Sequence, residues 1–112
     1  MNRYKLSKAG VNTNEAISRF GGNKEAYEKA LKGFSEELYF SRLRQAVKDR
    51  KLEDAFQAAH ALKGQVGNLG MTRFFEDLCP LVTELRLESF EKADELMVLL
   101  EEDYLAVISA LS

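Results

Sequence analysis

Apolar residues recur every three or four positions along most of the chain, a period that predicts helices rather than strands. The clearest example begins after Asn23, a residue type that favours helix N-termini. No segment shows a sustained alternation of apolar and polar residues, so we expect no sheet. The apolar positions of this example are Ala26, Tyr27, Ala30, Leu31 and Phe34, and the period continues through Leu38, Leu43, Ala46 and Val47.

Capping and breaking residues predict the helix boundaries. Asn12 and Glu15 form the reciprocal capping arrangement at the start of a short first helix. Gly70 is expected to act as the C-cap of the predicted helix Leu52–Leu69. The long second stretch is interpreted as one helix or two abutting helices, with Gly33-Phe34-Ser35 as the weak point. The predicted ranges are about Thr13–Phe20, Lys24–Asp49, Leu52–Leu69, Thr72–Arg86 and Phe90–Leu111.

The C-terminal half completes a predicted helical bundle. Thr72 is expected to cap the fourth helix, and Pro80 inside that helix removes one backbone hydrogen bond and is expected to kink it. Substantial helices with short connections predict an all-α fold, an antiparallel four-helix bundle with the short N-terminal helix as a cap over one end. The last helix is expected to bury Leu96, Leu99, Leu100, Tyr104, Val107, Ile108 and Leu111.

The composition agrees with one folded domain. The 112 residues are 46% hydrophobic and 30% charged, a balance typical of globular proteins. We expect a single helical-bundle domain over residues 1–112, with a core that needs no disulfide or metal. Cys79 is interpreted as a small buried hydrophobe, and one histidine with one cysteine supplies too few ligands for zinc.

The charge pattern and the N-terminus exclude several classes of function. The net charge is −2 and basic residues are interspersed with acids, so no nucleic-acid binding is expected. The start of the chain lacks a signal-peptide core, and the longest apolar run, near Leu96–Leu100, is too short for a membrane span. We therefore expect a soluble cytoplasmic protein without a membrane partner, and we interpret Glu101-Glu102-Asp103 as a solvated helix face.

One predicted helix carries the candidate chemistry. On a helical wheel with about 100° per residue, His60 falls opposite the apolar stripe. Gly64 and Gly67 lie beside His60, one and two turns later. Phe56 lies one turn before it, and Lys63 lies on its flank. The stripe consists of Ala55, Ala58, Leu62, Val66 and Leu69.

This arrangement indicates a nucleophile that another molecule approaches. Each interior glycine costs a helix roughly 1 kcal/mol relative to alanine, so two of them on a face expected to pack against nothing favour close approach of a partner. A neutral imidazole, whose ordinary pKa is about 6.5, is nucleophilic near neutral pH and forms covalent phosphohistidine. Lys63 would neutralise phosphoryl oxygens, although a merely solvated lysine is an equal alternative.

The segment from His60 to Gly70, HALKGQVGNLG in one-letter code, resembles the signature of histidine-containing phosphotransfer (HPt) domains of multistep two-component phosphorelays. The segment Gly10–Tyr27 is also similar to many of these domains, so the resemblance covers about Gly10 to the C-terminus. Several members of the family carry a glutamine on the following helix that orients the histidine ring. Here that region is Leu81–Glu84, without a glutamine, which leaves Thr83, Glu84 or a backbone carbonyl for the task.

The resemblance implies a phosphorelay intermediate. His60 would accept a phosphoryl group, at Nε2, from the aspartyl phosphate of one receiver domain and pass it to the aspartate of another. The implied partners are the receiver domains of a hybrid sensor kinase and of a response regulator, and the Mg²⁺ belongs to those receivers. The chain itself is then a carrier and no enzyme, with no cofactor and no ATP site. Phe56, Gly64 and Gly67 would dock the receiver, Lys63 would balance charge, and a monomer suffices.

Other functions stay open at this point. The chain is alternatively a helical module that docks a receiver or sensor kinase and regulates it without being phosphorylated, or a purely structural adaptor. An autonomous enzyme is least favoured, because no paired acid and base and no cofactor loop stand in the sequence. The Met start favours a free-standing protein, with a domain excised from a hybrid kinase as the alternative.

Overall fold

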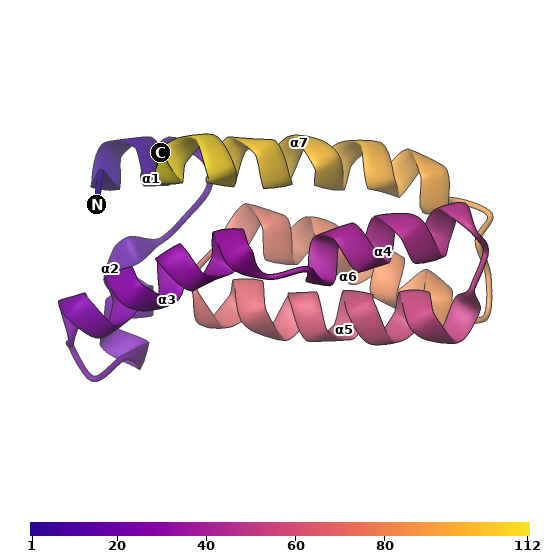
Figure 1. The fold of residues 1–112 in the computed structure, drawn as a ribbon, viewed down its shortest axis with the longest axis horizontal. Helices are drawn as coiled ribbons and strands as arrows, with labels where there is room; N and C mark the ends of the chain where they lie inside the picture. Colours follow the sequence, from indigo (N-terminus) through magenta and orange to yellow (C-terminus); the bar gives the residue numbers. More distant parts are fainter.

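Helices joined by short turns make up the whole structure, a computed structural model that describes residues 1–112 (Figure 1). No strand is present, and the only β-type contact is an isolated antiparallel bridge between Val11 and Met71, so the expected all-α fold is confirmed. The helices are α1 (Arg3–Lys8), α2 (Thr13–Arg19), α3 (Lys24–Glu36), α4 (Tyr39–Lys48), α5 (Leu52–Asn68), α6 (Thr72–Arg86) and α7 (Ala93–Leu111).

The last four helices form the predicted antiparallel bundle. Helix α4 packs on α5, α5 on α6 and α6 on α7, and α7 also contacts α3 and α4, which closes the bundle. Figure 1 shows α7 along one side of the molecule and α5 along the opposite side. Helix α1 lies against α7 beside the C-terminus, and α2 contacts both α1 and α3. The N-terminal cap therefore consists of two short helices rather than the one predicted.

A single cluster of buried apolar residues joins all seven helices, from Leu6 in α1 to Ala110 in α7. Aromatic rings hold its centre: the rings of Phe40 and Tyr104 stack with their centroids 4.4 Å apart, and Phe74 meets Phe40 edge-on at 5.8 Å. These contacts fasten α4 and α6 to α7. No helix combines the length and the apolar composition needed to cross a bilayer.

The long second stretch of the sequence forms two abutting helices. The break lies at Glu37 and Leu38, however, and the prediction of a weak point at Gly33-Phe34-Ser35 is wrong. Glu37 has an extended backbone, with ψ at 145°, which ends α3. The Phe34 side chain is buried in the core, so the turn that contains Gly33 is held in helical conformation by packing.

The start of α6 also differs from the prediction. Met71 occupies the N-cap position and makes no side-chain cap, whereas the Thr72 hydroxyl donates a hydrogen bond to the carbonyl of Gly70 at 3.3 Å. Thr72 is therefore the first helical residue and not the cap. Helix α6 continues through Pro80 to Arg86, and α7 begins at Ala93, three residues after the predicted Phe90.

The buried face of α7 contains a carboxyl group. Leu100 and Val107 are buried as predicted, but Leu99 is exposed and Asp103 is only 5% exposed. The interpretation of Asp103 as part of a solvated face is therefore wrong. Apolar residues occur on several sides of α7, so the sequence pattern does not identify which side is buried. Burial raises the pKa of Asp103 to about 7, and the carboxyl of Asp77 on α6 adds to the rise, while Arg73 opposes it.

Candidate functional site

His60 lies in the middle of α5 with its side chain exposed, as the helical wheel predicts. The opposite face of the helix is buried in the core and contains the predicted Ala55, Ala58, Leu62 and Val66. Glu53 and Asp54 lie in the first turn of α5, where their negative charges interact favourably with the positive end of the helix dipole. The chain has one histidine, so this is the single imidazole available for chemistry.

The aromatic ring of Phe56 lies against the imidazole of His60. The two rings are stacked, with centroids 5.8 Å apart and planes inclined by 27°. Their spacing of four residues places them one above the other on the same helix face. On the neighbouring helix α6, the guanidinium carbon of Arg86 lies 5.9 Å from the centroid of the Phe56 ring. Phe56 is partly buried, so it contributes to the core as well as to the exposed site.

The two glycines beside His60 have different surroundings. A Cβ atom on Gly64 would meet no other atom within 4 Å, so the backbone there is open to solvent. A Cβ atom on Gly67 would lie 3.1 Å from Cδ2 of Phe75 on α6. The prediction that both glycines pack against nothing in their own domain is therefore wrong for Gly67, where the missing side chain makes room for a ring of the same protein.

Lys63 extends toward α6 rather than lying free in solvent. Its Nζ atom lies 5.4 Å from the centroid of the Phe75 ring, an arrangement in which the ring quadrupole attracts the ammonium group. The ring of Phe75 thus lies beside both Lys63 and Gly67. Neither Phe75 nor Arg86 is among the residues predicted from the sequence, because both come from another helix.

None of the groups considered for orienting the His60 ring forms a hydrogen bond with it. No hydrogen bond joins the imidazole to any side chain or backbone group. Glu84 is engaged elsewhere, since its Oε1 accepts hydrogen bonds from the Lys92 backbone N–H at 2.7 Å and from the Ser89 hydroxyl at 3.3 Å. Thr83 is exposed and its hydroxyl forms no hydrogen bond. The aromatic ring of Phe56 is the neighbour that the structure places against the imidazole.

The C-terminal end of α5 is fastened from several directions. Gly70 has a φ of +74°, and the Met71 N–H donates to the Val66 carbonyl at 2.9 Å, which is the Schellman pattern that the glycine permits. The Tyr27 hydroxyl donates to the Leu69 carbonyl at 2.8 Å, and an Arg19 N–H donates to the Gly67 carbonyl at 3.0 Å. These bonds hold α5 in place beneath the exposed site, and Gly70 acts in the C-terminal turn as predicted.

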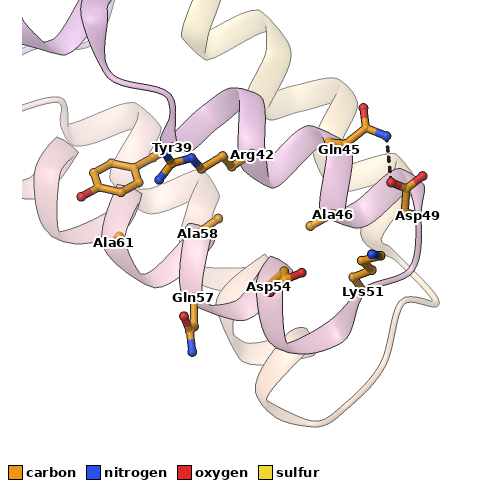
Figure 2. A pocket seen from close by; sticks show the side chains of 10 residues that line it. All are labelled: Tyr39, Arg42, Gln45, Ala46, Asp49, Lys51, Asp54, Gln57, Ala58 and Ala61. Carbon is orange, nitrogen blue, oxygen red and sulfur yellow. Dashed lines mark hydrogen bonds between the residues drawn. The ribbon is translucent and has the colours of Figure 1, made fainter.

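An open groove of about 530 Å³ runs between α4 and α5, on the flank of α5 that carries Ala58 and Ala61 (Figure 2). Gln57 and Ala61, three residues before and one residue after His60 on α5, both line the groove, so it lies along the helix beside the exposed site. Its remaining lining residues combine acidic and basic side chains with apolar surface: Tyr39, Arg42, Gln45, Ala46, Asp49, Lys51 and Asp54.

Residues 35–110 of the chain match the family model described as Hpt domain, which is more than half of the sequence. The match contains His60 and the whole segment up to Gly70, and the similar text of Gly10–Tyr27 lies outside it. No curated protein and no solved structure matches the chain.

Proposed function

The chain belongs to the Hpt domain family, and from this premise we propose that it is a phosphorelay intermediate that carries a phosphoryl group on His60. The observation that supports the proposal most directly is the exposure of the only imidazole of the chain on the outer face of α5. A carrier needs a nucleophile that two different partners reach in turn, and an exposed helix face allows both to approach.

The transfer step follows from the chemistry of the imidazole. In its neutral form, the lone pair of Nε2 attacks the phosphorus of an aspartyl phosphate on a receiver domain. The new P–N bond forms as the bond between phosphorus and the aspartate oxygen breaks, and the aspartate leaves as a carboxylate. Transfer to the second receiver is the reverse step, with a free aspartate as the nucleophile. The Mg²⁺ ion that assists the reaction is expected on the receiver, and this chain supplies neither cofactor nor ATP site.

Lys63 and Gly64 are proposed to serve the approach of the receiver. The ammonium group of Lys63, one turn from His60, balances the charge of the phosphoryl oxygens. The open backbone at Gly64 leaves space for the loops of the receiver beside the imidazole. Gly67 contributes indirectly, by accommodating Phe75, and Phe56 adds apolar surface for docking.

The partners we propose are the receiver domains of a hybrid sensor kinase upstream and of a response regulator downstream. A receiver would cover α5 and extend over the adjoining groove between α4 and α5, whose mixed charges offer polar contacts at the rim (Figure 2). A single exposed site on each copy makes a monomer sufficient for this cycle.

The proposal is tested by incubating the protein with a receiver domain that carries labelled phosphate. The wild type is expected to acquire label that is lost in acid and kept in base, the stability of a phosphohistidine, and His60→Gln is expected to acquire none. A wild type that binds a receiver and stays unlabelled would instead identify a docking module that regulates its partner without phosphorylation.

A further inference from the structure

The imidazole of His60 stacks on one aromatic ring of its own chain, that of Phe56. The near-parallel planes, 27° apart, bring the faces of the two rings together. No hydrogen bond competes with this contact, since the site offers none to the imidazole. Within the chain, the stack is thus an interaction that favours one plane of the His60 ring over another.

The plane of the ring matters for phosphoryl transfer. The lone pair of Nε2 lies in the plane of the imidazole, so the direction of attack on phosphorus turns with that plane. In-line displacement requires the lone pair, the phosphorus and the leaving oxygen to stand nearly on one line. A ring that rotates freely presents the lone pair in this direction for only part of the time.

We propose that Phe56 is a positioning residue, which holds the plane of the His60 imidazole for attack on phosphorus and is itself held by Arg86. This inference rests on the proposed function, because it assumes that His60 is the nucleophile. It assigns Phe56 a role inside the chain, in addition to any contact with a receiver.

Arg86 supplies the restraint that packing alone does not give to Phe56. A hollow of about 440 Å³ adjoins the ring and is lined by residues of α5 and α6, among them Leu52, Leu85 and Arg86. The ring therefore has open space on one side. The guanidinium of Arg86, 5.9 Å from the ring centroid, attracts the face of the ring and opposes its rotation into this space.

A small phosphoryl donor separates positioning from docking. With phosphoramidate, Nε2 of His60 attacks phosphorus, the P–N bond of the donor breaks, and the nitrogen leaves as ammonia after taking up a proton. No receiver takes part, so residues that only dock a receiver do not change this rate. Phe56→Leu keeps apolar bulk and removes the flat ring, and Phe56→Tyr keeps the ring.

We expect Phe56→Leu to be phosphorylated by phosphoramidate roughly two- to tenfold more slowly than the wild type, the range that corresponds to the strength of one aromatic pair. Phe56→Tyr should restore most of the rate. Phe90→Leu is the matched control: Phe90 is also partly buried and has the guanidinium of Arg50 5.3 Å from its ring, but it has no histidine beside it. That variant should react like the wild type.

Nuclear magnetic resonance of the single imidazole provides a readout that a purely structural role would not move. The ring current of Phe56 should shift the carbon-bound protons of the His60 ring, and Phe56→Leu should abolish this shift while Phe56→Tyr and Phe90→Leu keep it. Thermal melts of all variants establish that the compared proteins are folded at the temperature of the assay.

The outcomes distinguish this inference from the proposed function. If the wild type takes phosphate from a receiver on His60 but Phe56→Leu reacts with phosphoramidate at the wild-type rate, or its imidazole signals are unmoved, the positioning role is refuted and the carrier function stands. If no receiver labels the wild type, the proposed function fails, while the phosphoramidate rates and the imidazole shifts still decide whether Phe56 orients the ring.

Discussion

Individual residues around His60 divide into those that leave space and those that fill it. Gly64 has open space where a side chain would be. We propose that a partner reaches the imidazole from this position. The space where a side chain of Gly67 would lie is filled by the ring of Phe75, and the ammonium group of Lys63 lies over that ring. The two interior glycines of α5 thus differ in their surroundings, since Gly64 adjoins open space and Gly67 adjoins a ring of the same chain.

Gly64→Glu should block transfer and leave the fold intact. No atom lies within 4 Å of the added Cβ, and glutamate is a better helix former than glycine, so the free energy of unfolding should be unchanged or higher by up to about 1 kcal/mol. The new carboxylate occupies the approach to His60 and repels phosphate, so transfer from a receiver should fall at least about tenfold, as measured by rapid-quench labelling.

Gly33→Glu is the matched control for this variant. Gly33 is also a helical glycine at which an added Cβ would meet nothing within 4 Å, but it lies in α3. The Gly33→Glu variant should transfer phosphate at the wild-type rate. Equal rates for both variants would remove the explanation of Gly64 as the point of approach.

Lys63→Ala should slow transfer without abolishing it. One exposed charge-assisted contact to the phosphoryl group is lost, which corresponds to a rate reduced roughly three- to tenfold. Lys63→Arg keeps the charge, and its transfer rate in rapid-quench measurements should lie between those of the wild type and of Lys63→Ala. An unchanged rate for Lys63→Ala would identify the residue as a solvated lysine that takes no part in the reaction.

At the scale of elements, the position of α5 is determined at its C-terminal end. The Schellman turn at Gly70 and the bonds from Tyr27 and Arg19 all converge on the last carbonyl groups of the helix. The Tyr27 hydroxyl is buried in this contact, and burial raises its pKa to about 12, so it stays protonated and donates its hydrogen bond throughout the neutral range.

Tyr27→Phe should destabilise the protein by about 1–2 kcal/mol, because the buried Leu69 carbonyl loses its hydrogen-bond donor. Urea denaturation followed by circular dichroism measures the difference. The aromatic packing against Phe20 is retained by the substitution, so the loss reports on the hydroxyl alone. A free energy of unfolding equal to that of the wild type would show that this bond does not hold the end of α5.

The elements with distinct ends and one apolar face could be predicted from the sequence. Helix α5 begins and ends within about a residue of its predicted range, because Gly70 marks its end and the alanine-rich stripe marks its inner face. Helix α1 is absent from the prediction, since its six residues contain only one buried side chain, Leu6. The break between α3 and α4 has no glycine or proline to mark it.

The site could be predicted as far as it lies on one helix. His60, Lys63 and Gly64 are related by helical geometry alone, so their common face follows from their spacing. Phe75 and Arg86 reach the site from α6, and their placement depends on how α6 is rotated and shifted against α5. A single sequence carries no local signal for that register, which is set by the packing of the whole core.

At the scale of the whole molecule, the carboxyl group of Asp103 couples stability to pH. It lies within the bundle, where Asp77 and Arg73 of α6 face it and Glu102 adds negative charge from its own helix. Its pKa is about 7 in the folded protein, against an ordinary value of 3.8. Because the folded state holds the proton more tightly, the stability that this group contributes is complete below about pH 4 and is lost as the pH rises through about 7.

Asp103→Asn should remove this dependence. At pH 8 the wild type contains a buried carboxylate and the variant does not, so the variant should be more stable by on the order of 2 kcal/mol. Near pH 4 the wild-type carboxyl is protonated and the two proteins should be close in stability. Thermal melts across pH 4 to 8 measure the difference, and parallel curves for the two proteins would contradict the assignment of this proton to Asp103.

The most direct measurement of the central claim is to locate the phosphate after transfer from a phosphorylated receiver. The protein is digested at neutral pH, and the peptides are mapped by mass spectrometry under conditions that preserve phosphohistidine. Phosphate is expected on the peptide Leu52–Lys63, at His60, and nowhere else in the chain. Phosphate on any other residue, or none in a protein that the same receiver binds, would contradict it.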